Sequence, residues 1–463
     1  MIDNFASKEF LKLKNCKMIQ NFLINFFQGE ISLKDKIGYF TFFLGVFLLP
    51  SAMALSILFF IVAISISFIN PNNFFKDKWN YPFLISSFFM IMSSLKHFEN
   101  TGELYKSYWE PSLSLIGLLN WIPLFFFFWG FQKYLNSPEK RMFTSKIFIC
   151  GSIPVIISGI LQLLNINGPL ETLNGLVIWY QKPLTDIGGS LSGLFNNQNY
   201  AGLWMVMIWP FCLAANMQKN LTRSLKLIVL LISLSFLVFI FLTDSRNAFL
   251  CFLISTPLVL GKSSLLWYLP TLLIRFSFLA LAVIPIFPEE IQIFAKSIVP
   301  SRIYTKFPEI GFNNLIEYPR ISKWASAFGY ILQKPLFGWG AAAFPVIYRL
   351  EKGGAWFGHA HNLPLELMVS YGVPAALFII TPILTLIIIS SRKIFNEAIY
   401  KSNLIFDRAW IVSLIVLLVS QLVDVQYFDG RISILIWILL SGSRNIINNN
   451  LNNYKQNNNI TYK

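Results

Sequence analysis

Charged residues are scarce in this sequence, and their scarcity excludes an ordinary soluble protein. They make up 13% of the chain, against roughly 25% in an average soluble domain, whereas hydrophobic residues reach 55%. Apolar runs such as residues 224–242 are long enough to cross a bilayer and lack the polar face that a helix on a soluble core needs. The composition predicts an integral membrane protein.

Disulfide and metal motifs are also lacking. The four cysteines, Cys16, Cys150, Cys212 and Cys251, form no CxxC pair and have no histidine at metal-ligand spacing. No Walker A, HExxH or DxD-type metal motif occurs where it would matter. We therefore expect no disulfide framework, no metal and no cofactor. No removable signal pattern precedes the first apolar run, so the first spans are expected to direct insertion.

The net charge of +15 comes from short basic clusters between apolar segments rather than from one basic face. This pattern argues against a nucleic-acid partner and is typical of cytoplasmic loops, which are rich in Lys and Arg. We expect a cytoplasmic amphipathic segment over residues 1–37, a polytopic membrane domain over 38–443, and an Asn-rich cytoplasmic tail over 444–463.

The apolar segments predict an all-α integral membrane fold with about twelve transmembrane helices and both termini in the cytoplasm. The stretch from Gly38 to Asn70 is long for one span and short for two, and its length alone leaves both open. Only a hairpin at Pro50 keeps every later basic cluster on the cytoplasmic side. The expected spans are 38–50, 52–69, 81–95, 112–132, 143–163, 198–217, 224–242, 247–261, 264–287, 362–391, 409–424 and 431–443.

Two segments predicted to lie on the outer face stand out, residues 164–197 and the much longer 288–361, and such loops often carry function. In the second, apolar residues recur at helical spacing from Trp324 to Ile331. This spacing predicts an amphipathic helix that lies against the bundle or the lipid headgroups, with Arg320 at its N-terminal edge.

Histidine is rare, and two of the three histidines form the sequence HAHN where the long segment re-enters the membrane. These are His359 and His361, and His97 is the third. A neutral imidazole is the usual general base near pH 7, and Asn362 could orient a sugar hydroxyl or the imidazole. The alternative, a polar helix end ordered for packing, is equally compatible with a bare His-Asn pair.

Three arginines lie at the ends of, or within, expected membrane or loop helices, where a charged side chain requires an explanation. Arg246 is expected at the outer end of a span and Arg320 at the start of the loop helix, and their rigid donor forks suit phosphate oxygens. Snorkelling to the headgroups describes most arginines at such positions. Arg275 lies within an apolar run, where a charge is a functional candidate, although Pro270 could place it at the interface instead.

Two further polar groups have simpler explanations. Asn199, in GLFNNQNYAGL, could contact a glycan, but helix capping accounts for that asparagine cluster. Asp424, Asp429 and Arg431 bracket the last outer turn, where mutual ion pairing is favoured over a role in the wall of a site.

Taken together, residues 190–390 resemble the O-antigen ligase and polymerase superfamily of bacterial membrane glycosyltransferases. SRNAFL resembles the R-x-x-x-L element of that family, with Arg246 and Leu250. YPRISKW resembles the outer-loop arginine followed by tryptophan, here Arg320 and Trp324.

A third element follows in the family order. HNLPLELMVSYGVPA resembles the family's H-N, nine-residue spacer and Gly element, through His361, Asn362 and Gly372. Three residues after that glycine, Ala375 stands where the family often has Gly, Thr or Tyr.

The resemblance implies a GT-C-like bundle of about twelve helices in the bacterial inner membrane, with a large periplasmic loop of helices over a cavity open to the outer leaflet. It implies metal-independent, inverting transfer of a glycan from undecaprenyl diphosphate to lipid A core or to a growing glycan. Arg246 and Arg320 would neutralise the diphosphate, and His361 would take the acceptor proton. The expected substrate contacts are Asn362, His359, Asn199 and Trp324.

Other functions stay open at this point. A ligase and a polymerase of the same superfamily are not separated by these motifs. A transporter, for instance of inorganic carbon, usually shows internal repeats or several buried charges, and only Arg275 is a candidate here. A membrane scaffold fits the composition but does not predict HAHN beside the longest loop.

Overall fold

The computed structural model of this chain describes residues 32–69, 74–98, 103–218, 221–284, 286–299, 304, 319–354, 356–395 and 404–448. Most of the expected cytoplasmic segment 1–37 and of the Asn-rich tail 444–463 lies outside the described residues. The same is true of part of the long segment 288–361.

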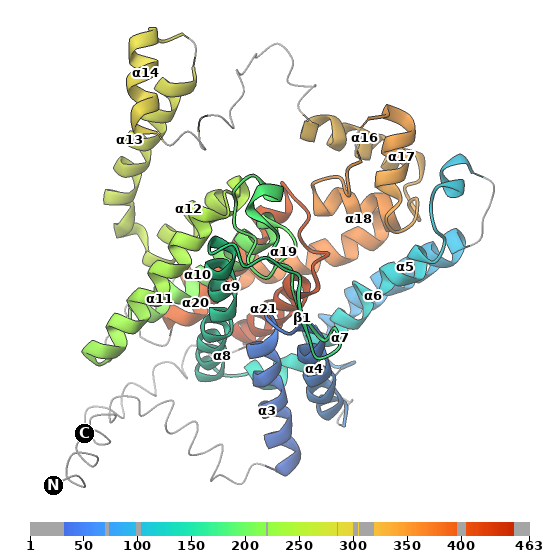
Figure 1. Cartoon of the computed structure of the whole chain (residues 1–463). Helices are drawn as coiled ribbons and strands as arrows, with labels where there is room; N and C mark the ends of the chain where they lie inside the picture. Colours follow the sequence, from blue (N-terminus) through green and yellow to red (C-terminus); the bar gives the residue numbers. More distant parts are fainter. Residues whose placement is uncertain are drawn as a thin grey trace, which may run out of the picture.

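The described chain is mostly helical (Figure 1). Its α-helices are α3 (Leu33–Leu48), α4 (Met53–Phe68), α5 (Asn80–Phe98), α6 (Leu113–Leu119), α7 (Ile122–Gly130), α8 (Pro138–Gly151), α9 (Ile153–Leu163), α10 (Gln198–Asn216), α11 (Arg223–Leu242), α12 (Arg246–Leu260), α13 (Leu265–Val283), α14 (Glu289–Ile298), α16 (Pro319–Gln333), α17 (Ala343–Lys352), α18 (Leu363–Tyr371), α19 (Val373–Phe395), α20 (Leu404–Gln421) and α21 (Gly430–Asn448). The 3-10 helices are η3 (Leu104–Ser107), η4 (Phe131–Leu135), η5 (Leu184–Ile187) and η6 (Lys262–Ser264), and the strands are β1 (Leu170–Thr172) and β2 (Val177–Trp179).

Seven helical segments of the described chain are long and apolar enough to cross a membrane. An all-α membrane protein is therefore confirmed, whereas the expected number of twelve spans stays a prediction. Helices also occupy the other five expected spans, and α4 and α12 among them are shorter apolar helices. The seven segments are Leu113–Leu135, Pro138–Leu163, Arg223–Leu242, Leu265–Val283, Val373–Phe395, Leu404–Gln421 and Gly430–Asn448.

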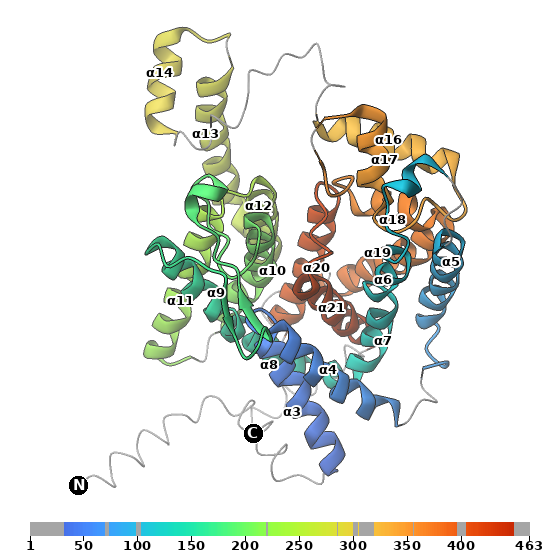
Figure 2. The ribbon, with the colours of Figure 1, turned by 45° about the vertical axis from the view of Figure 1, so that its right-hand side comes forward.

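The core of the bundle lies around α10, α20 and α21. Four consecutive residues of α10, from Trp204 to Met207, are fully buried, which means that α10 has no lipid-facing side. In contrast, α13 is mostly exposed and packs chiefly against α14 at the periphery (Figures 1 and 2). The exposed Arg275 lies on this peripheral helix.

A buried ion pair ties α8 to α20. The guanidinium of Arg141 donates two hydrogen bonds to the Asp407 carboxylate, at 2.6 and 2.7 Å, and both side chains are fully buried. Arg141 was expected in a cytoplasmic loop over residues 133–146, but α8 begins at Pro138 and carries this arginine into the bundle. Arg141 stays charged inside the bundle because the Asp407 carboxylate forms an ion pair with it.

The apolar stretch at Pro50 is divided into two helices, as the hairpin interpretation requires. A turn over residues 49–52 separates α3 from α4, which pack side by side. The Ser56 hydroxyl donates to the Gly45 carbonyl oxygen at 2.7 Å, and the ring of Phe60 lies where a side chain at Gly45 would be. Close approach of the two helices therefore depends on Gly45.

The segment 164–197, which was expected on the outer face, contains the two strands, which an all-α prediction did not include. They pair antiparallel, with Leu170 opposite Trp179, around a turn whose residues Leu173 to Gly175 have positive φ angles. Trp179 anchors this hairpin by donating its indole N–H to the Ser51 carbonyl oxygen at 2.9 Å.

The single span expected over residues 362–391 is also divided. Gly372 ends α18 with a φ of 88°, and a Cβ there would lie 2.2 Å from the Leu336 carbonyl oxygen. Only glycine fits that contact and that backbone angle. The HAHN sequence therefore precedes a separate short helix, and the candidate membrane span begins at Val373.

Candidate active site

Three ionisable side chains from two distant parts of the chain meet between α18 and the turn after α20. The Nδ1 atom of His361 lies 2.9 Å from Oδ1 of Asp424, and Nε2 of His359 lies 3.9 Å from the same oxygen. The two imidazole rings touch edge to face, with centroids 4.4 Å apart. Asp424 is 9% exposed and His361 25% exposed, so this cluster is largely sheltered but reachable.

The backbone of the HAHN sequence is held at both ends. Asn362 caps α18 by accepting the Leu365 N–H at 3.0 Å, and its amide donates to the Leu422 carbonyl oxygen at 2.9 Å. The buried Glu366 carboxylate accepts the Ala360 N–H at 2.8 Å. These contacts fix the loop that carries His361 against the turn that carries Asp424.

His361 itself adopts a backbone conformation that is rare outside glycine. Its φ is 54°, and a non-glycine residue in such a sparsely populated region costs on the order of 1–3 kcal/mol. The surrounding hydrogen bonds impose this conformation, which aims the imidazole at Asp424. Strain of this kind is concentrated at functional sites.

The hydrogen bonds define where the protons are. The His361 N–H donates to Nδ1 of His359 at 3.2 Å, so a neutral His359 carries its proton on Nε2. Burial, with the neighbouring His361, lowers the pKa of His359 to about 4. Asp424 receives a hydrogen bond from His361 Nδ1–H, which leaves Nε2 of His361 with a free lone pair.

Asp424 stays ionised although it is buried. Burial alone would raise its pKa, but the hydrogen bond from His361 and the two nearby imidazoles outweigh it and lower the pKa below the ordinary value. Its carboxylate also accepts the Val425 N–H at 3.0 Å and the Gln426 amide at 3.1 Å.

The expected mutual pairing of Asp424, Asp429 and Arg431 is therefore wrong for Asp424. Arg431 pairs with Asp429 at 2.7 Å and lies over the Phe195 ring at 4.1 Å. Asp424 belongs to the histidine cluster instead, because the turn after α20 directs it towards HAHN. The sequence signal for this was only its position at the outer end of an expected span.

Helix α16 contributes the cationic part of the site. The Trp324 indole N–H contacts the His361 carbonyl oxygen at 3.4 Å, which seats the helix on the HAHN loop. The side chain of Arg320 is half-buried and forms no side-chain hydrogen bond or ion pair with any described residue. Figure 2 shows α16, α17 and α18 gathered at one end of the bundle.

Lys323 is a cation that the sequence interpretation missed. It is buried, with its Nζ atom 3.4 Å from the Phe357 ring centroid, and it lies within electrostatic range of Arg320 and Asp424. Burial and the charge of Arg320 lower its pKa, and Asp424 opposes them. Its spacing of three residues from Arg320 puts both on one helix face, which is the signal that could have identified it.

The predicted helix from Trp324 to Ile331 is confirmed, but the buried face differs from the expected one. Ala327 and Ile331 are buried, whereas Phe328 is 58% exposed. The buried stripe instead includes Lys323 and Tyr330. A lysine on this stripe reduces its apolar character and provides a charge beside the histidine cluster.

Arg246 lies at the first residue of α12, after the Ser245 cap, and its side chain is exposed. The next residue, Asn247, donates its amide to the Ser420 hydroxyl at 2.8 Å. Ser420 donates to Gln426, which in turn donates to Asp424. A chain of hydrogen bonds therefore connects the start of α12 to the histidine cluster.

Asn199 lies in the first turn of α10, where its N–H is accepted by the side chain of Asn197 at 2.7 Å. Helix capping by this asparagine cluster is therefore confirmed, with Asn197 as the cap. The neighbouring Tyr200 lies within electrostatic range of Asp424 and Asp429, so this turn faces the same end of the bundle as the histidine cluster.

The cluster also has the residue types of a metal site. Ligand atoms of His359, His361 and Asp424 lie within 4.8 Å of one another. A metal on Nε2 of His359 requires the proton on Nδ1, but Nδ1 accepts the His361 N–H instead. The hydrogen bonds of this cluster therefore fit proton transfer better than metal binding.

Comparisons with known proteins agree with the family resemblance. Residues 228–380 match the family model described as O-antigen ligase, a range that contains Arg246, Arg320 and His361 but ends before Asp424. No curated protein matches the chain. This match over residues 228–380 supports the O-antigen ligase and polymerase superfamily of membrane proteins.

Proposed function

We propose that this protein is a membrane glycosyltransferase that moves a glycan from undecaprenyl diphosphate to an acceptor hydroxyl. The observation that carries the proposal is the His361–Asp424 contact of 2.9 Å beneath a helix that bears Arg320 and Lys323. It provides a general base and cations for a diphosphate at one end of the bundle. The family match over residues 228–380 supports the same chemistry.

His361 acts as the base. As the acceptor oxygen attacks the anomeric carbon, its proton passes to the free Nε2 atom of His361. The resulting imidazolium is stabilised by the ionised Asp424 on the opposite side of the ring. Asn362 acts by holding the HAHN loop, because both polar ends of its side chain bind backbone groups.

The cations act on the leaving group. The bond between the acceptor oxygen and the anomeric carbon forms on the face opposite the breaking bond to the diphosphate, so the configuration inverts. The diphosphate leaves with the bonding electron pair, and Arg320, Lys323 and Arg246 stabilise its growing charge. Because protein cations perform this task, the reaction requires no metal ion, and a chelator should leave the rate unchanged.

The acceptor is a lipid A core in a ligase and a growing glycan in a polymerase. We propose the ligase as the principal assignment, in a bacterial inner membrane with the site on the periplasmic side and both termini in the cytoplasm. A strain that lacks a ligase accumulates long lipid-linked polymer, whereas a strain that lacks a polymerase accumulates single repeats. The glycan ladder of a deletion strain therefore distinguishes these two acceptors.

Reconstituted vesicles test the assignment. Wild-type protein with lipid-linked glycan and acceptor should form product with the inverted anomeric configuration, measured by NMR. Arg320→Ala should abolish transfer. The matched control is Arg349→Ala, which removes an exposed arginine from α17 in the same region and should leave transfer intact.

Three results would count against the proposal. Equal transfer by the Arg320→Ala variant would remove the arginine's role, and retention of configuration would refute direct displacement. Uptake of solute into the vesicles without any glycan transfer would favour a transporter instead.

A further inference from the structure

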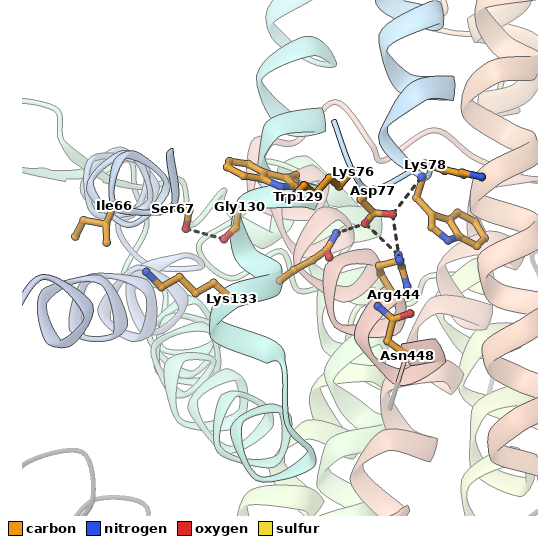
Figure 3. Close-up of a pocket in the computed structure, with 12 residues that line it drawn as sticks. Ile66, Ser67, Lys76, Asp77, Lys78, Trp129, Gly130, Lys133, Arg444 and Asn448 are labelled. Carbon is orange, nitrogen blue, oxygen red and sulfur yellow. Dashed lines mark hydrogen bonds and ion pairs between the residues drawn. The ribbon is translucent and has the colours of Figure 1, made fainter. Parts of the chain in front are cut away.

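A cavity of about 800 Å³ lies between the ends of α4, α7 and α21 (Figure 3). Its lining carries four basic side chains, Lys76, Lys78, Lys133 and Arg444, and a single acidic one, Asp77. The proposed transfer reaction does not use any of them. The cavity therefore needs a separate explanation.

The cavity lies at the opposite end of the bundle from the histidine cluster. Helix α21 starts six residues after Asp424 and ends at Asn448, which lines the cavity. Its 19 residues correspond to about 28 Å of helix, close to the ~30 Å thickness of a bilayer's hydrocarbon core. The cavity and the candidate active site are therefore placed at opposite membrane surfaces.

The acidic residue of the cavity is already engaged. Asp77 accepts two hydrogen bonds from the Arg444 guanidinium, at 3.0 and 3.1 Å, and a backbone N–H from Trp79 (Figure 3). This pair connects the loop before α5 to the end of α21. The wall of the cavity is thereby fixed, and Asp77 has little capacity to neutralise other cations.

The remaining cations are in excess. Lys133 pairs with Asp35 at 2.5 Å. Lys76 and Lys78 are exposed and form no ion pair or side-chain hydrogen bond with any described residue. Two unpaired ammonium groups at the rim of a cavity that also contains a guanidinium attract an anion with several oxygen atoms.

The surroundings of the cavity suit a lipid rather than a soluble anion. Trp79 and Trp129 line it at the level of the cations, as aromatic side chains do at the headgroup depth of a bilayer. Beside it, Phe68, Ile69 and Phe75 are 39%, 55% and 65% exposed. These apolar side chains provide a surface for acyl chains next to a cationic pocket.

We infer that this cavity binds the phosphate headgroup of an anionic phospholipid in the leaflet opposite the candidate active site. The phosphate lies against Lys76, Lys78 and Arg444, and the acyl chains follow the exposed side chains near α4. Basic pockets between transmembrane helices are known to hold such headgroups. The bound lipid bridges the loop before α5 and the end of α21.

The test uses the full chain in phosphatidylcholine vesicles that contain a rising fraction of photoactivatable phosphatidylglycerol. Cross-linking should saturate and should map to peptides around Trp79 and Trp129. Lys76→Gln/Lys78→Gln should raise the half-saturating lipid fraction roughly thirtyfold. The control Arg223→Gln/Lys226→Gln removes two exposed cations from the start of α11 and should leave that fraction unchanged.

Two outcomes would overturn the inference. Unchanged labelling of the Lys76→Gln/Lys78→Gln variant would mean that the cavity does not select the headgroup. Loss of phosphatidylglycerol labelling in millimolar inorganic phosphate would identify a soluble phosphate compound as the ligand instead. Neither outcome affects the glycan transfer assay, because these residues are remote from His361.

Discussion

Replacement of Asp424 by Asn removes one negative charge from the histidine cluster with almost no change in shape. In the wild type the carboxylate receives hydrogen bonds from His361, Val425 and Gln426. An asparagine offers one oxygen to these donors instead of two. Its oxygen can still accept the His361 Nδ1–H, but the imidazolium formed during transfer loses its counter-charge.

The size of the effect follows from the geometry. Two unit charges 2.9 Å apart interact by about 6 kcal/mol at an effective dielectric constant of about 20. A hydrogen bond to a charged group is stronger than a neutral one by roughly 1–2 kcal/mol. This difference sets the lower limit of the expected rise in the activation free energy. Because Asp424 is only 9% exposed and weakly screened, we expect the upper part of this range. Asp424→Asn should therefore slow transfer by roughly 10³-fold or more.

The assay is the initial rate of glycan transfer in vesicles, with saturating donor and acceptor. The matched control is Asp429→Asn, which makes the same change five residues away and breaks the ion pair with Arg431 instead. Both variants should insert into the membrane, but only Asp424→Asn should lose transfer. A loss of less than about threefold for Asp424→Asn, a factor worth roughly 0.7 kcal/mol, would refute the counter-charge role.

Three further predictions concern the same loop and the bundle. His359→Asn keeps an acceptor at the position of Nδ1 for the His361 N–H and should retain most of the transfer activity. His359→Gln moves that acceptor and should lose the transfer activity, and initial rates of transfer measure both effects. The pKa of His359 is about 4 in the folded chain, below its ordinary 6.5, so the unfolded chain binds the proton first as the pH falls. Acidification from pH 6.5 to 4 should therefore destabilise the folded wild type by up to ~3 kcal/mol. Thermal unfolding of His359→Asn should lack this contribution to the loss of stability. Arg141→Met leaves the buried Asp407 carboxylate without its ion-pair partner and should lower the free energy of unfolding by about 3–5 kcal/mol. Arg141→Met/Asp407→Leu should recover most of that loss in the same thermal unfolding assay. Equal losses in both variants would contradict this reasoning.

Composition and local pattern were sufficient for the fold class. Long apolar runs define helices in lipid, because backbone groups there must be hydrogen-bonded within the segment. The helix that carries Arg320 in its first turn and the break at Pro50 also followed from local rules. The division of residues 362–391 did not, because the need for Gly372 arises from contact with Leu336, which is distant in the sequence.

The candidate site was predicted only in part. His361, Arg320 and Asn362 could be identified because the motifs that contain them are local. Asp424 could not, because its partner is 63 residues away and its nearest charged neighbours in the sequence suggested a different ion pair. Lys323 was missed because a lysine on an amphipathic helix is usually solvated, and only the fold shows that Phe357 covers it.

A single-turnover experiment with His361→Ala tests the central proposal most directly, because it separates donor binding from chemistry. The variant is loaded with lipid-linked glycan, acceptor is added, and the decay of bound donor is followed. Donor binding should persist through Arg320 and Lys323, while transfer should fall to the background rate. Transfer at the wild-type rate would show that the imidazole takes no part in the reaction and would contradict the mechanism.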